Sequence, residues 1–131
     1  MSLTKDDLES MGYFDAFSTY DKDGKPKSDS TSYSSWVEGK ILTEGHERLV
    51  ENTLGLVGEA GEVAEKIKKL IRDKSRFTPD DIAKELGDVV FYATALANYY
   101  GHTLSSVLEI NIEKLDGRED RGTLKGSGDN R

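Results

Sequence analysis

Two short acidic motifs, each inside a segment with helical periodicity, constrain this chain more than any other feature of its sequence. Glu59-x-x-Glu62 and Glu85-x-x-Asp88 are separated by 22 residues. Residues three apart lie beside each other on one face of a helix, so each motif places two carboxylates side by side. The sequence therefore predicts two neighbouring helices that together carry four carboxylates.

The second motif borders an apolar stripe, so Glu85 is expected to be partly buried. Burying a lone charge is costly unless the charge is paired or binds a metal. No Lys or Arg shares the helical column of Asp81, Glu85, Asp88 and Tyr92, and this unrelieved acidic column indicates a cation. Carboxylate oxygens without His or Cys favour Mg²⁺ or Mn²⁺ over zinc. The alternative is an ordinary solvated acidic face, in a chain with 33% charged residues.

Three blocks of sequence around these motifs occur in a fixed order: GLVGEAGEVAEKIKK, KELGDVVFYATALA and NIEKLDGREDRG. Together they resemble the MazG-like, all-α nucleoside triphosphate pyrophosphatase superfamily over residues 54–121. Its members include dUTP and dCTP pyrophosphatases and phosphoribosyl-ATP pyrophosphohydrolase. The resemblance implies that Mg²⁺ is bound by Glu59, Glu62, Glu85 and Asp88. It also implies hydrolysis of a nucleoside triphosphate to the monophosphate and pyrophosphate.

The fold that follows is an all-α helical bundle in which the hairpin from 46 to 100 packs against a third helix. Broad apolar stripes on these helices leave surface exposed in a monomer. The resemblance likewise implies helices assembled with those of a partner subunit, as a homodimer or homotetramer.

Asn111, Lys114 and Arg118 lie at helical spacing along one edge of the third helix. An amide and cations in a column can hold phosphate oxygens, and the resemblance implies that these residues bind the triphosphate. Read alone, Lys114 and Arg118 are basic residues favoured at a helix C-terminus. We favour phosphate binding because Asn111 points into the apolar stripe, where an amide needs a partner.

Base recognition is predicted ahead of the first acidic motif, where the resembling enzymes carry aromatic residues. Trp36 and His46 are the candidates for stacking on the base or hydrogen-bonding to it. The alternative is that Trp36 packs in the core or a dimer interface and that His46 lies at a helix end.

The predicted mechanism is metal-assisted attack of water on the α-phosphorus, with one or two Mg²⁺ ions held by the four carboxylates. Glu62 is the candidate for orienting or deprotonating that water because it lies farthest from the apolar stripe. Lys114 and Arg118 are candidates for stabilising the leaving pyrophosphate. Two other functions stay open: phosphoribosyl-ATP pyrophosphohydrolase, and a non-catalytic helical dimerisation module.

Composition excludes several other classes. The absence of cysteine rules out a disulfide or a thiolate nucleophile. A formal charge of -7 argues against nonspecific nucleic-acid binding, which draws on a basic surface. No apolar run approaches the length of a membrane span, and the first residues lack signal-peptide character, so the cytosol is the expected compartment.

The 131 residues are expected to form one domain with three parts. Residues 1–45 are an N-terminal extension with short helices and a polar loop, 46–118 form the catalytic helical core, and 119–131 form a flexible tail. Within the extension we expect a short helix at 4–11, an aromatic cluster at 13–20, a loop at 21–32 and a helix at 33–42.

The core is expected to contain a helix over 46–72, either continuous or broken near Gly55. Its glycines at three-residue spacing would let a backbone or a phosphate approach closely. Lys66 is expected to form an i,i+4 pair with Glu62, and the alternative is a contact with phosphate. A second helix should begin after the N-cap Thr78 and end before Gly101. A third, capped by Thr103, should run from Leu104 to about Leu115.

Overall fold

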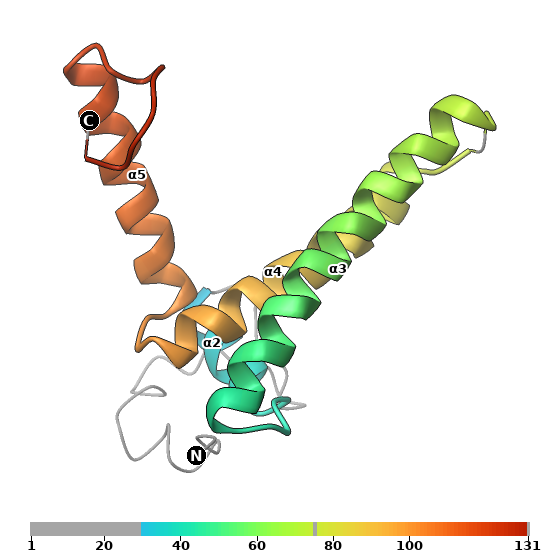
Figure 1. The fold of residues 1–131 in the computed structure, drawn as a ribbon, viewed down its shortest axis with the longest axis horizontal. Helices are drawn as coiled ribbons and strands as arrows, with labels where there is room; N and C mark the ends of the chain where they lie inside the picture. Colours follow the sequence, from blue (N-terminus) through green and yellow to red (C-terminus); the bar gives the residue numbers. More distant parts are fainter. Residues whose placement is uncertain (1–29, 75, 131) are drawn as a thin grey trace.

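The computed structural model describes residues 30–74 and 76–130, and every regular element within these two ranges is an α-helix (Figure 1). The helices are α2 Ser30–Glu38, α3 Gly45–Arg72, α4 Pro79–Tyr99 and α5 Leu104–Asp120. The all-α prediction is confirmed. The short helix and the aromatic cluster predicted for 4–20, and most of the predicted polar loop, lie outside the described residues.

The starts of α4 and α5 are fixed by reciprocal caps. The Thr78 hydroxyl accepts from the Asp81 amide at 3.2 Å, while the Asp81 carboxylate accepts from the Thr78 amide at 2.9 Å. Thr103 and Ser106 make the same exchange, at 3.1 and 3.2 Å. Each exchange satisfies two backbone donors that lack partners inside the helix. Gly101 adopts a φ of +80° between the two helices, so both predicted starts and the stop are confirmed.

α3 runs without a break through its three glycines. A Cβ built on Gly55 would overlap the ring of Tyr92 in α4, whereas one built on Gly58 would meet nothing within 4 Å. Gly55 is therefore required because an aromatic ring, and not a backbone, lies against it, while within the described chain nothing lies against Gly58 or Gly61.

Substituting alanine at these two glycines should have opposite effects on stability. Overpacking at Gly55→Ala is expected to cost about 1–3 kcal/mol, which outweighs the gain of about 1 kcal/mol that alanine gives in a helix interior. Gly58→Ala should show the gain alone. Urea unfolding of both variants measures the difference, and equal stabilities would contradict the close packing of Tyr92 on α3.

Two helices have boundaries that differ from prediction. α2 begins at Ser30 and ends at Glu38, instead of spanning 33–42, because Gly39 follows and the Glu38 side chain is engaged by α3. α5 continues to Asp120, beyond the expected Leu115. Its last turn carries the buried Arg118, which bonds to the segment that follows the helix.

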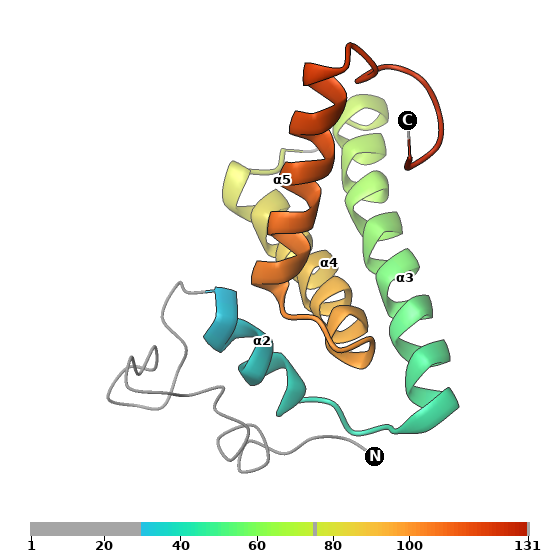
Figure 2. The same ribbon diagram turned by 90° about the vertical axis from the view of Figure 1, so that its left-hand side faces the viewer.

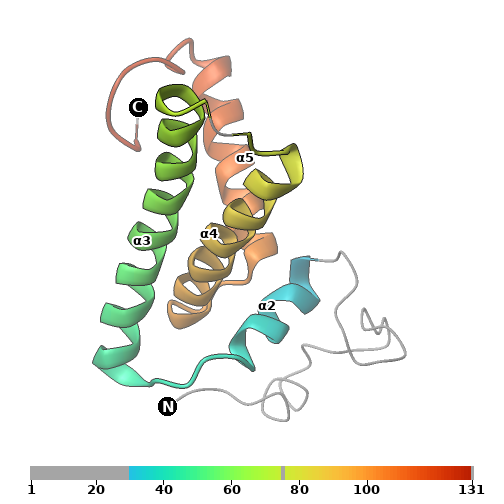
Figure 3. The same cartoon turned by 90° about the vertical axis from the view of Figure 1, so that its right-hand side faces the viewer.

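α3 and α4 lie antiparallel and side by side, forming the central hairpin (Figure 3). α5 leaves the end of α4 at a wide angle, so that it and the hairpin form a V in Figure 1. It packs against α2 and α4, and within the described chain it makes no contact with α3. The predicted packing of the third helix on the hairpin therefore holds for α4 only.

In Figure 2, α2 lies beside the lower ends of α4 and α5. A buried polar junction ties it to the hairpin. The Arg48 guanidinium donates to both carboxylate oxygens of Glu38, at 2.6 and 2.8 Å, and to the carbonyl of Ala95. Asn98 donates to Glu38 at 3.1 Å and to the carbonyl of Ser34 at 2.9 Å. This ion pair joins α2, α3 and α4 at the base of the V.

Fully buried apolar side chains are scarce. Among the described residues only Val37 and Ala95 are hydrophobic and buried, while Leu54, Val57 and Ile71 on α3 are more than half exposed. Exposed apolar residues also follow α5: Val107, Leu108, Ile110, Ile112 and Leu115. The described helices thus leave long apolar faces uncovered. Across the same ranges, no helix has the length and apolar character needed to cross a bilayer.

Candidate metal centre

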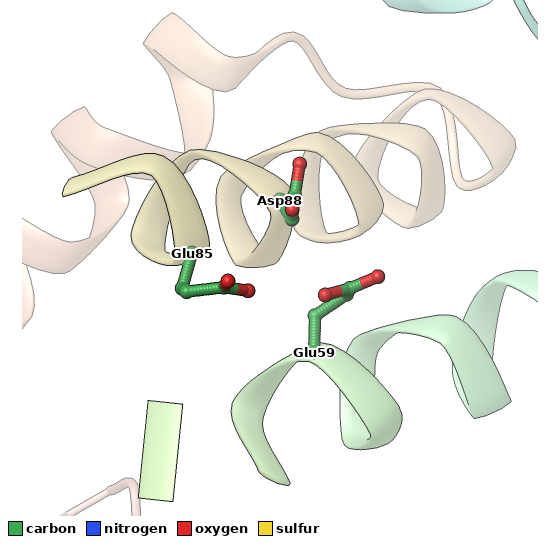
Figure 4. A group of neighbouring side chains, drawn as sticks. All are labelled: Glu59, Glu85 and Asp88. Atoms are coloured by element: carbon green, nitrogen blue, oxygen red, sulfur yellow. The ribbon is translucent and has the colours of Figure 1, made fainter. Parts of the chain in front are cut away.

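Three of the four predicted carboxylates meet between the two helices of the hairpin (Figure 4). Glu59 comes from α3, and Glu85 and Asp88 come from α4. One oxygen of each lies within 4.8 Å of the other two. Glu59 and Glu85 are half-buried and Asp88 is exposed. We call these three residues the carboxylate cluster.

The electrostatics of the cluster show mutual repulsion. Desolvation raises the pKa of Glu59 above its ordinary value, and the charges of Asp88, Glu85 and Glu62 raise it further. A divalent ion would relieve this repulsion. Three hard oxygen donors close enough to share one ion are a donor set that fits Mg²⁺ or Mn²⁺, with water and substrate oxygens completing the coordination.

Glu62 does not join the cluster. It is exposed one turn beyond Glu59 on α3, although its charge still acts on Glu59. Its predicted partner Lys66 also lies elsewhere: the ammonium is 3.4 Å from Glu85 Oε1 in α4. The expected i,i+4 pair with Glu62 is therefore wrong, and the acidic column on α4 is relieved by a cation from the adjacent helix. Periodicity within one helix could not reveal that contact.

Aromatic side chains adjoin the cluster on the side of α2. The Trp36 ring lies 5.6 Å from Tyr33 and 6.2 Å from Phe91, measured between ring centroids. Burial raises the pKa of Tyr33, and the charge of Asp88 raises it further, so the phenol lies within electrostatic range of Asp88. Tyr33 and Phe91 were not predicted as site residues; their signals are the spacing of three from Trp36 and from Asp88.

His46 lies apart from this aromatic group. It is exposed in the first turn of α3, at the end of the helix opposite Arg72. Trp36, by contrast, is half-buried, and Lys40 lies over its ring at 5.5 Å. Of the two predicted base contacts, Trp36 is the one that belongs to the surroundings of the carboxylates.

The predicted phosphate-binding residues all lie on α5, away from the hairpin. Asn111 is exposed because the apolar stripe beside it is itself exposed, so the expected burial of its amide is not found in the described chain. Lys114 and Arg118 both pair with Asp129, at 3.3 and 3.1 Å, and Arg118 also donates to the Gly128 carbonyl. Within one chain these cations do not face the carboxylate cluster.

Comparison with known proteins covers a much longer part of the chain than the three carboxylates. Residues 46–123 match the family model described as the MazG nucleotide pyrophosphohydrolase domain. The chain is also 52% identical over 83 residues to the Gene 37 protein of Mycobacterium phage L5, an alignment covering 60% of this chain and 73% of that protein. No solved structure matches the chain. The family match spans the carboxylate cluster and the basic residues of α5.

Proposed function

Since the chain belongs to the family of MazG nucleotide pyrophosphohydrolase domains, we propose that it hydrolyses a nucleoside triphosphate to the monophosphate and pyrophosphate. The observation that carries the proposal is the meeting of Glu59, Glu85 and Asp88 within 4.8 Å. These carboxylates would hold Mg²⁺. When bound, that ion supplies charge neutralisation of the phosphates and acidification of a water molecule.

Residues of the chain itself position the phosphates, accept the proton of the attacking water and bind the base. Glu59, Glu85 and Asp88 would hold the ion and so position the phosphates that bind to it. Glu62, exposed at the edge of the cluster, orients the attacking water and takes its proton. The base packs against the aromatic group of Tyr33, Trp36 and Phe91, which offers ring faces next to the carboxylates.

The active enzyme is a homodimer, or a tetramer built from such dimers. Apolar faces on α3, α4 and α5 are exposed in one chain, and extended exposed apolar faces mark interaction surfaces. Lys114 and Arg118 are basic and remote from an acidic cluster that needs cations for its substrate. A second copy of α5 placed against the hairpin covers apolar surface and brings opposite charges together. Lys114 and Arg118 then exchange their ion pairs with Asp129 for contacts with the phosphates.

Complementation between two inactive variants checks this shared site. Glu85→Gln removes a carboxylate of one chain, and Lys114→Met removes a cation from a side chain that is 36% exposed, so the fold should persist. Refolding equal amounts together makes half of the dimers mixed, each with one intact site. Activity should therefore recover to about a quarter of that of the unmodified protein. A mixture no more active than its components would assign the cations to their own chain.

The reaction itself is tested by incubating the protein with Mg²⁺ and each common ribo- and deoxyribonucleoside triphosphate, with phosphoribosyl-ATP alongside. Ion-exchange chromatography should show monophosphate and pyrophosphate, with one base preferred. Diphosphate and phosphate would contradict attack at the α-phosphorus. The absence of turnover on every substrate would favour the non-catalytic dimerisation module.

A further inference from the structure

Lys66 is held between a carboxylate of the cluster and an aromatic ring. Its ammonium nitrogen lies 3.4 Å from Glu85 Oε1 and 4.8 Å from the centroid of the Phe77 ring. The two ion-paired side chains are only 26% and 21% exposed. Contact with an aromatic face favours a cation at that place. The ammonium therefore has a defined position on the rim of the cluster rather than free movement in solvent.

The charge of Lys66 changes what the cluster can bind. Among the described residues, it is the one basic side chain that forms an ion pair with Glu59, Glu85 or Asp88. Three carboxylates and one ammonium leave a net charge of two negatives, which a single divalent ion neutralises. That same ammonium repels the free ion and attracts the phosphates that arrive with it.

We propose that Lys66 is a charge-matching residue that weakens binding of the free divalent ion and strengthens binding of the ion together with a triphosphate. The second half of this statement rests on the proposed function; the first half depends on the carboxylate cluster alone. The site would thereby select the metal–nucleotide complex over the metal.

Two effects of Lys66 on the free ion oppose each other. Holding Glu85 in place helps the ion, but an ion pair that water still reaches contributes less than about fivefold in affinity. Repulsion between a unit charge and a divalent ion one carboxylate away is on the order of tenfold or more, even when largely screened by water. Repulsion dominates, so removing the charge should tighten binding of the free ion.

Substitution of Lys66 separates this role from simple structural support. Lys66→Gln should bind free Mn²⁺ about three- to tenfold more tightly by isothermal titration calorimetry, and should raise the KM for the magnesium–nucleotide complex about tenfold. Lys66→Arg keeps the charge and should restore both values. The matched control is Lys68→Gln, because Lys68 lies on the same helix and pairs with Glu65 at 2.9 Å; neither value should move.

The opposite signs of the two changes decide the outcome. If Lys66 only supported the fold, its substitution would weaken Mn²⁺ binding and also raise KM. That result, or an unchanged Mn²⁺ affinity in Lys66→Gln, overturns the proposal. The calorimetric measurement contains no nucleotide. If the unmodified protein turned over no substrate, the proposed function would fail, while repeating the Mn²⁺ titration with inorganic tripolyphosphate would still test both halves for Lys66.

Discussion

Replacing Glu85 by glutamine is expected to lower pyrophosphohydrolase turnover by at least about 100-fold, a loss of roughly 3 kcal/mol in transition-state stabilisation. Glu85 contributes an oxygen to the carboxylate cluster and is half-buried between α3 and α4. Glutamine keeps its shape but removes the charge that a hard divalent ion requires. Steady-state kinetics measure the loss in activity, and thermal unfolding with and without Mg²⁺ measures the loss of the ion.

Two companion variants make this prediction specific. Unmodified protein should be stabilised by Mg²⁺ through mass action, and Glu85→Gln should lose that stabilisation. Glu62→Gln should lower turnover but should still be stabilised by Mg²⁺, because Glu62 lies outside the cluster. Glu65→Gln, which alters a half-exposed carboxylate paired with Lys68 outside the cluster, should change neither turnover nor stabilisation. A Glu85→Gln protein that is still stabilised by Mg²⁺ would remove this residue from the ion site.

Breaking the buried ion pair at the base of the V should cause the largest loss of stability. Arg48 and Glu38 are 5% and 3% exposed, and Arg48 Nε has no hydrogen-bond partner of its own. Glu38→Gln leaves the guanidinium charge buried without its counter-ion. Removing one partner of such a pair costs about 3–5 kcal/mol, so the thermal midpoint should fall by roughly 10 °C or more.

A double substitution tests whether burial of charge causes this loss. Glu38→Leu combined with Arg48→Met replaces the pair by apolar groups and should recover most of the stability. Lys68→Gln, which breaks an exposed pair on α3, should cost less than about 1 kcal/mol. A loss below 1 kcal/mol for Glu38→Gln would show that water reaches Arg48.

Features encoded within a few neighbouring residues were predictable from the sequence. Thr78 followed by proline and two aspartates specifies a capped helix start, and the structure contains both hydrogen bonds of the capping box. The three-residue spacings of the acidic motifs placed carboxylates on the facing sides of two helices, and the structure brings three of the four together. In both cases the information lies within one or two helical turns.

Features that depend on contacts between helices were not predictable in this way. The end of α2 is set by the engagement of Glu38 with Arg48, ten residues away, and the partner of Lys66 lies on α4. The ring against Gly55 comes from Tyr92, so the three glycines could not be told apart by their spacing. Asn111 was expected to be buried because one helix pattern cannot show that its stripe lacks a cover.

The antiparallel hairpin of α3 and α4 also sets the order in which the chain acquires its parts. Glu59 and Glu85 belong to consecutive helices, and contacts this local in sequence form early and fast, within microseconds to milliseconds in helical proteins. Association of two chains is slower and depends on concentration. The carboxylate cluster is therefore assembled in a unimolecular step, whereas in the proposed dimer Lys114 and Arg118 would reach it in a bimolecular one. Dilution should thus remove catalysis while the hairpin keeps its affinity for the ion.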